Sequence, residues 1–540
     1  MFSQLFSLMM DNAANCNTTA TELQKLNPKF DAKKRRGRCT LHSIQLGAKM
    51  FLSFFSKEPA RKARKVKVTA ADGQVEEVTL KGITGDDGDA ELNRLLDENA
   101  AADEADLQQA ADAAARQIHD LAAIKNLRQR AIREMDLKGV TVSASDTKLA
   151  IQLLPRVSKS LPASARHSSA ICGQVAGLSR RIHDSSPIKH AFGLYVSADA
   201  TIQGQTTTIA RRCASRWDSN HDMLATLLIL EQPARKLLND KAFNLKAYKL
   251  AEKQWSLGRE VCDLLECFQL VTQRFSRRDS SRALVCEVIP AIEELRRRMH
   301  NASEMDGTQT DEEGVAIPAL PDICRVAAYA ASLVLDQYLL LMQECEIYEF
   351  AIALRPDLKL NYFRKNGRSE ADIKRIHDGL VERFKDFKPA SDPVSATAPP
   401  STQPAPRRSG GSRFDTKPRS TTPSVPTQTP DDIRSYLASP IVDLGGRTVL
   451  EYWHSERRMQ PHLAEMGLAF CSAPATSVDM ERAFSEGRNM CAWNQRSMSS
   501  QTFREQISVA AWYDAPFFDM GIAEQIIREK SRPLRGPEDA

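Results

Sequence analysis

The hydrophobic positions of this chain recur mainly at three- and four-residue spacing, which is typical of helices that bury one face. Few β-branched runs interrupt this spacing. The pattern predicts successive helices over Leu224–Leu237, Tyr248–Phe275, Ala283–Met299, Ile323–Tyr348 and Ile373–Phe387. The sequence therefore favours a large α-helical block in the middle of the chain.

The N-terminal end has a different pattern. A short apolar run over Met1–Met10 stops at Asp11, and helical patterns follow over Thr19–Leu26 and Ile44–Phe55. Asp11 is therefore expected at the end of a strand or in a turn. A carboxylate there is a common metal ligand, but Asp and Asn also occupy turns for local reasons, because their side chains hydrogen-bond to nearby backbone groups. The residues alone leave both interpretations open.

Two stretches lack apolar spacing. Asp86–Asp112 is acidic and rich in Ala, which indicates a flexible insertion leading into a helix over Ile118–Ile132. Lys388–Pro430 is dominated by Pro, Ser, Thr and Ala, which predicts a disordered linker.

Near the C-terminus, Thr476 and Asp479 have the spacing of a capping box and predict a helix that begins near Ser477. Four residues then recur on one face of that helix, which is predicted to be buried: Met480, Phe484, Gly487 and Cys491. Glu481 lies at the border of this face. By itself it is explained as a first-turn carboxylate that complements the helix dipole or pairs with Arg482 or Arg488.

Composition narrows the class of protein. With 540 residues, of which 42% are hydrophobic, the chain is long enough for more than one domain. Its net charge of +5 permits contact with nucleic acid without requiring it. The most apolar segment, Val326–Met342, is shorter than the roughly 20 residues that a bilayer needs and predicts a buried helix. Eleven cysteines without a Cys-x-x-Cys pair indicate reduced thiols rather than a disulfide framework.

A resemblance adds to this picture. Five residues of the C-terminal helix resemble the Ser-x-x-x-Glu-Arg-x-Phe-Ser signature of the hAT family of cut-and-paste transposases: Ser477, Glu481, Arg482, Phe484 and Ser485. Tyr436-Leu437 before Pro440, Tyr452-Trp453 and Pro461-His462 resemble the approach to the family's dimerisation region. This resemblance covers roughly Asp431 to Asp514.

The resemblance implies a fold that is mainly α with a small α/β part, in which an incomplete RNase H-like core is interrupted by a large α-helical insertion domain. On this basis we expect six segments: a partial RNase H-like segment (1–56), a charged flexible insertion (57–117), the insertion domain (118–387), the linker (388–430), the dimerisation region with the end of the core (431–520) and a tail (521–540).

The resemblance also implies catalytic residues. The Asp-Asn-Ala-x-Asn string resembles the family's second catalytic aspartate, so Asp11 and Glu481 are the predicted catalytic and metal-binding pair. In the family, three carboxylates hold two Mg²⁺ ions for phosphoryl transfer. The first aspartate and a zinc finger belong upstream, and we expect this chain to lack both. Asp31 and Asp184 are alternative third carboxylates.

Further residues are candidates for packing or for DNA. Cys39 and His42 resemble the family's Cys-x-x-His, but a structural zinc site needs four ligands, so we predict packing or hydrogen bonding for this pair, as for Phe484. Arg216 and Trp217 resemble a pair near the transposon end, where an indole stacks on a displaced base, and Arg482 is a third DNA-binding candidate. The alternative for Trp217 is a place in the core.

The sequence thus predicts a transposase-derived nuclear protein that forms homodimers or higher oligomers, contacts DNA and lacks one catalytic carboxylate. Mg²⁺ is expected only if the catalytic site is complete. Neither a membrane nor a small-molecule substrate is predicted. Two alternatives stay open: an active Mg²⁺-dependent DNA transposase or nuclease, and a helical scaffold that binds only protein.

Overall fold

A computed structural model provides the coordinates. The structure describes residues 6–11, 14–55, 65–69, 75–79, 126–153, 174–202, 205–213, 217–277, 283–310, 314–388, 431–490, 498–512, 521–522 and 525. These residues are mostly helical, as the apolar spacing predicted.

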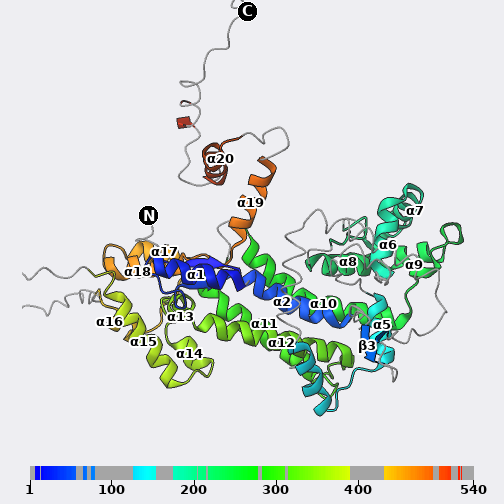
Figure 1. Ribbon diagram of the computed structural model, residues 1–540, viewed down its shortest axis with the longest axis horizontal. Coiled ribbons are helices and arrows are strands. Elements are labelled where there is room, and N and C mark those ends of the chain that lie inside the picture. The colour runs from blue at the N-terminus through cyan, green and yellow to red at the C-terminus, as the bar shows by residue number, and fades with distance from the viewer. Residues whose placement is uncertain are drawn as a thin grey trace, which may run out of the picture.

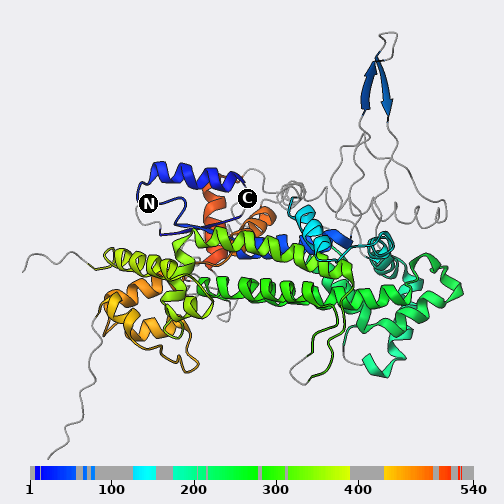
Figure 2. The ribbon, with the colours of Figure 1, turned by 90° about the horizontal axis from the view of Figure 1, so that it is seen from below.

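Four long helices form the centre of the molecule: α2 (Thr40–Leu52), α10 (Glu252–Ser276), α11 (Val288–Glu304) and α12 (Asp322–Gln343). They lie side by side along the long axis (Figures 1 and 2), with α2 packed against both α10 and α12. The close approach requires Gly47 in α2, because a Cβ there would lie 3.1 Å from the ring of Phe268 and 3.3 Å from Leu335. Residues from both ends of the chain thus share one core.

Among the described helices, α12 has the length and apolar composition of a membrane-crossing segment. However, 72% of its most apolar stretch is buried inside the protein, where α2 and α11 pack against it. Its composition therefore reflects its place at the centre of the core.

The N-terminal segment forms a small βαβ unit. Strands β1 (Leu8–Met10) and β2 (Arg36–Arg38) pair in parallel, with Met9 opposite Gly37, and helix α1 (Ala14–Leu26) connects them. The predicted strand thus ends immediately before Asp11. A second, antiparallel pair joins β3 (Lys65–Thr69) to β4 (Val75–Thr79). The side chain of Tyr348 lies beside β2. Its hydroxyl oxygen is 2.7 Å from both the amide nitrogen and the carbonyl oxygen of Arg38.

A helical lobe lies at one end of the long helices (Figure 1). It contains the helices α5 (Ala144–Leu153), α6 (Gln174–Asp184), α7 (Ser186–Ser197), α8 (Asp218–Ile229) and α9 (Glu231–Asn239) and the 3₁₀ turns η4 (Ala200–Ile202), η5 (Lys241–Phe243) and η6 (Lys246–Tyr248). A further helix, over residues 126–137, lies against α12, where Glu134 accepts a hydrogen bond from the Tyr329 hydroxyl.

The opposite end is built from segments on both sides of the predicted linker. Before the linker lie η7 (Val285–Glu287), α13 (Glu346–Ala353), α14 (Asn361–Lys365) and α15 (Glu370–Phe384), and after it α16 (Ile433–Ala438), α17 (Val449–Glu456) and α18 (Pro461–Cys471). Helix α18 packs against α13, α15 and η7. The chain then continues into α19 (Val478–Met490) and α20 (Ser500–Trp512), which pack on each other and rise from the body as a hairpin (Figure 1).

The predicted helices agree with the structure except at interruptions that spacing does not reveal. The pattern over Leu224–Leu237 is divided between α8 and α9, and the pattern over Ile323–Tyr348 between α12 and α13. The predicted helix over Ile44–Phe55 begins earlier, at Thr40, and ends in the 3₁₀ turn η2 (Ser53–Phe55). The predicted flexible insertion and the linker lie outside the described residues, apart from the β3–β4 pair and Lys388, and the six predicted segments stay predictions.

Candidate functional site

Asp11 follows β1 directly and faces the first turn of α2. Its Oδ1 lies 2.8 Å from His42 Nδ1, in a pair that is largely shielded from solvent. The backbone carbonyl of Asp11 accepts a hydrogen bond from Arg36 Nη2 at 2.9 Å. Just before it, the carbonyl of Met10 accepts one from the Cys39 amide at 2.8 Å. Asp11 is therefore held by β2 and by α2, and it does more than cap a local turn.

Glu481 approaches the same turn of α2 from the other end of the chain. Ser477 precedes α19, and its hydroxyl donates to Glu481 Oε1 at 3.1 Å. The amide of Ser477 donates to Cys39 Sγ at 3.4 Å. Thr40 donates to the carbonyl of Ala475 through both its amide (3.2 Å) and its hydroxyl (2.7 Å). These contacts fix the start of α19 beside the start of α2.

The first turn of α2 thus connects the two predicted catalytic segments. Cys39 contacts Met10 on one side and Ser477 on the other, while His42 binds Asp11. Cys39 and His42 are both buried, which agrees with the packing and hydrogen-bonding role expected for them. Burial raises the pKa of the Cys39 thiol, and the nearby Glu481 carboxylate adds to the rise. The thiol is therefore protonated at neutral pH in the absence of a metal ion.

The described residues do not complete a metal site. Nowhere in the described ranges do three His, Cys, Asp or Glu side chains group as ligands for a metal ion. Asp31 accepts hydrogen bonds from the amides of Lys33 and Lys34 at 2.9 Å, which is a local turn. Asp184 ends α6 in the helical lobe, 3.9 Å from Arg211. Within the described ranges, neither alternative carboxylate groups with Asp11 or Glu481 as a set of metal ligands.

Two of the DNA-binding candidates have partners within the protein. Arg482 donates to the carbonyl of Ser276, the last residue of α10, at 2.5 Å and lies 3.3 Å from Asp479. Trp217 is only 7% exposed and packs edge-on against Phe268, with 6.1 Å between ring centroids. The packing supports the core alternative for Trp217, because this indole offers no open face to a base. Arg216 lies outside the described residues, as does the side chain of Phe484.

The face of α19 that was predicted to be buried is only partly buried. Gly487 is buried against α20, where a Cβ would lie 2.6 Å from Ile507. Met480, however, is 57% exposed, so the prediction for this residue was wrong. Periodicity identifies an apolar face but does not say what covers it. The helix begins at Val478, close to the predicted start near Ser477, and the Ser477 hydroxyl donates to Glu481 Oε1 in the first turn.

The sequence also missed contacts on which the site depends. Arg36 is buried, and its guanidinium donates to the Asp11 carbonyl and to the side-chain oxygen of Asn17. Arg35 points to Glu346, with 3.7 Å between Nε and Oε1. One sequence signal could have indicated that Arg36 is buried. Arg36 and Arg38 alternate with Gly37 in a short strand that follows a helix.

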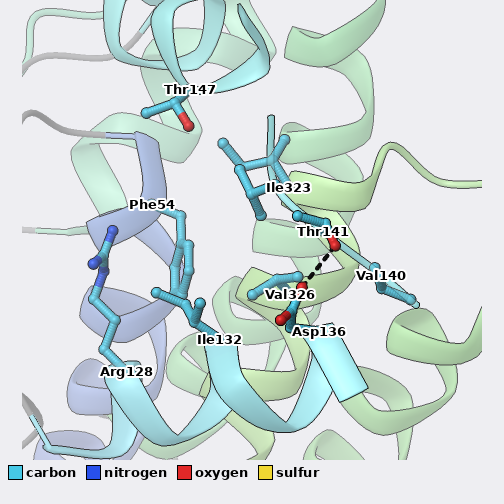
Figure 3. Close-up of a pocket in the computed structure, with 10 residues that line it drawn as sticks. Phe54, Arg128, Ile132, Asp136, Val140, Thr141, Thr147, Ile323 and Val326 are labelled. Carbon is cyan, nitrogen blue, oxygen red and sulfur yellow. Dashed lines mark hydrogen bonds between the residues drawn. The ribbon is translucent and has the colours of Figure 1, made fainter. Parts of the chain in front are cut away.

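One described pocket, of about 220 Å³, lies away from this junction (Figure 3). Phe54, Ile132, Ile323 and Val326 contribute apolar walls, and Arg128 lies over the Phe54 ring at 4.4 Å. Two of its polar lining residues hydrogen-bond to each other, because the Thr141 hydroxyl donates to Asp136 at 2.8 Å. None of the predicted site residues lines it.

Comparison with known proteins agrees with the C-terminal resemblance. Residues 432–513 match the family model described as the hAT family C-terminal dimerisation region. No curated protein is significantly similar to the chain. The matched residues run from α16 through α20 and include the start of α19, with Ser477 and Glu481. Residues 432–513 are therefore similar to the C-terminal dimerisation region of the hAT transposase family.

Proposed function

We propose that this protein is a transposase derivative that self-associates, contacts DNA and is catalytically incomplete. The observation that carries the proposal is the dimerisation region over residues 432–513, whose start is built into the same core as the rest of the described chain. Self-association then joins two whole molecules rather than two flexible tails. The nucleus is the proposed location, which a fluorescent fusion of the full chain would test.

Self-association is tested with the full-length chain by light scattering coupled to size-exclusion chromatography. We expect a species of twice the monomer mass at micromolar concentration, and its fraction should fall on dilution. A monomer at every concentration up to tens of micromolar would reject this part of the proposal. The helical scaffold alternative shares the dimer but predicts no binding to DNA.

DNA contact is supported by the positive net charge and by exposed cations that have no acidic partner in the described contacts, such as Arg181 and Lys189 around the α6–α7 turn. Neutralising phosphates releases counterions, so the logarithm of the affinity should fall linearly with the logarithm of the salt concentration. Fluorescence anisotropy with a labelled duplex measures this slope. An affinity too weak to detect at about 50 mM salt would favour the scaffold alternative.

Catalytic incompleteness is supported by the donor set at the α2 junction, because the described residues there do not group three possible metal ligands. The active-transposase alternative is favoured by a different observation, namely the contacts that hold the Asp11 and Glu481 segments at the same turn of α2. A nicking assay with Mg²⁺ on hairpin and duplex DNA separates the two. We expect no cleavage above background. Cleavage that Glu481→Gln abolishes would instead establish the enzyme.

A further inference from the structure

We propose that the α19–α20 hairpin is the surface to which a second copy of this chain binds, whereas α16–α18 anchor the hairpin to the body. The inference rests on the proposed self-association and divides the dimerisation region into two parts with different roles. The structure supports the division because the aromatic side chains of α16–α18 are buried within the same molecule.

The first part is built into its own molecule. Trp453 in α17 is fully buried, and its Nε1 donates to the carbonyl of Leu354 at 2.9 Å. Phe470 in α18 is also fully buried, among the rings of Phe6, Phe350 and Phe387. Each of these aromatic side chains therefore already has neighbours from elsewhere in its own chain.

A buried lysine adds a polar anchor to this part. Lys359 is 2% exposed, and its ammonium donates to the carbonyls of Tyr436, Ser439 and Pro440 and to the Ser439 hydroxyl over 2.6–3.0 Å. It also lies 4.4 Å from the centre of the Tyr436 ring. Several of the carbonyls are at the C-terminal end of α16, where a positive charge is favourable. Detaching α16 would separate the ammonium group from all four of these acceptors, so Lys359 holds α16 on the body.

The second part leaves apolar side chains uncovered. Phe503 and Ile507 of α20 pack against Gly487, so the hairpin has an interior. Met480 on α19 is nevertheless 57% exposed and Val509 on α20 is 50% exposed. Apolar spacing assigned Met480 to a buried face, and the single chain does not bury it. In Figure 1 both helices stand away from the long core helices.

A second copy is the occupant that fits this surface. The family region that includes the hairpin is described as a dimerisation region, and α19 and α20 lie within it. Most homodimers have two-fold symmetry, so the same surface of each copy would meet. Two helical hairpins that meet in this way form a four-helix arrangement, which buries apolar faces efficiently. The base of each hairpin stays fixed by Arg482 on Ser276 and Ser477 on Cys39.

Substitutions at exposed apolar residues of the two parts test the proposal in the full-length chain. Met480→Asp with Val509→Asp places charges on the hairpin, while Met459→Asp places one on the anchored part, where Met459 is 52% exposed. We expect the hairpin variant to be monomeric at concentrations where the wild-type chain is dimeric, with a dissociation constant raised at least about 100-fold. Met459→Asp should leave the dimer unchanged. Circular dichroism should stay within the wild-type range, because every substituted side chain is exposed. Thermal midpoints should match only at concentrations where both proteins are monomeric, since association raises the apparent midpoint.

The outcomes separate this inference from the proposed function. A wild-type chain that is monomeric would reject self-association itself. A wild-type dimer that persists in Met480→Asp with Val509→Asp would reject the hairpin and retain self-association. A dimer lost in Met459→Asp but kept in the hairpin variant would assign the interface to the α16–α18 part. If the double variant unfolds, Met480→Gln alone provides the milder polar change, and an unchanged dissociation constant in that variant would overturn the inference.

Discussion

Gly467 in α18 and Gly193 in α7 are both helical glycines, but their surroundings differ. A Cβ on Gly467 would lie 2.4 Å from ring atoms of the buried Trp453, whereas a Cβ on Gly193 meets no atom within 4 Å. The ring of Trp453 cannot move away easily, because its Nε1 is bound to Leu354. Close packing of α17 on α18 therefore requires glycine at position 467.

We expect the same substitution to have opposite effects at these two positions. Gly467→Ala should lower the free energy of unfolding by about 1–3 kcal/mol through overpacking. Gly193→Ala should raise it by about 0.5–1 kcal/mol, because alanine favours the helix and restricts the unfolded chain. Urea denaturation followed by circular dichroism measures both. Equal effects of the same sign would contradict the packing that the structure shows around Trp453.

A buried carboxylate at the residue scale predicts a pH dependence. Glu349 in α13 has a side chain that is 1% exposed and binds Arg375 of α15 through both oxygens, at 2.9 and 3.1 Å. Burial raises the pKa of Glu349 above its usual value, more than Arg375 lowers it. The folded protein therefore holds this proton at pH values where the unfolded chain has lost it.

Glu349 should consequently destabilise the fold as it becomes charged. Relative to Glu349→Gln, the wild-type chain is expected to lose stability as the pH rises from the usual glutamate value, near 4.5, to the raised folded value. Thermal midpoints of both proteins between pH 4 and 7 measure the difference. Arg375→Gln should steepen the loss, since it leaves the buried charge unpaired. A difference that is constant with pH would contradict the raised pKa.

At the scale of elements, the first turn of α2 joins segments that are more than 400 positions apart in the sequence, because Thr40 binds the Ala475 carbonyl. The helices on both sides could be predicted from apolar spacing, since the period of a helix is written into local sequence. The contact itself could not be, because a hydrogen bond between Thr40 and Ala475 depends on the path of the whole chain. The signature around Glu481 identified the residue without locating its neighbours.

Thr40→Val tests whether this junction positions the start of α19. Thr40 is fully buried, and valine keeps its shape but removes the hydroxyl that donates to Ala475. We expect a loss of about 1–2 kcal/mol and faster hydrogen exchange in the first turns of α19, with exchange in α11 unchanged. Thr502→Val, at an exposed position of α20, is the control. Unchanged exchange in α19 would show that the hydroxyl does not position this helix.

At the scale of the whole molecule, buried side chains from α2 to the end of α18 form one core. The core contains several buried cysteines, and every cysteine within the described ranges is a free thiol, in agreement with the reduced state predicted from their spacing. Burial raises the pKa of Cys262 and of Cys345 to about 12. Cys213, by contrast, is exposed.

Thiol reactivity should therefore report the opening of the core. Because the thiolate is the reactive form, iodoacetamide at pH 8 is expected to modify Cys213 first, and Cys286, Cys345 and Cys471 only when the core opens. Peptide mass spectrometry over time measures each site, and Cys213→Ser is the control for the fast phase. Rapid modification of Cys471 in the native protein would show that α18 detaches from the body.

The sequence by itself determined the helical character of the chain, the end of β1 before Asp11 and the family signature around Glu481, because each depends on residues that are neighbours along the chain. Only the tertiary structure decided that Asp11 and Glu481 flank the first turn of α2, that Trp217, Trp453 and Phe470 are core residues, and that Met480 stays exposed. These outcomes depend on which surfaces meet. A local pattern shows that a face is apolar, but its partner is chosen by the packing of the whole molecule.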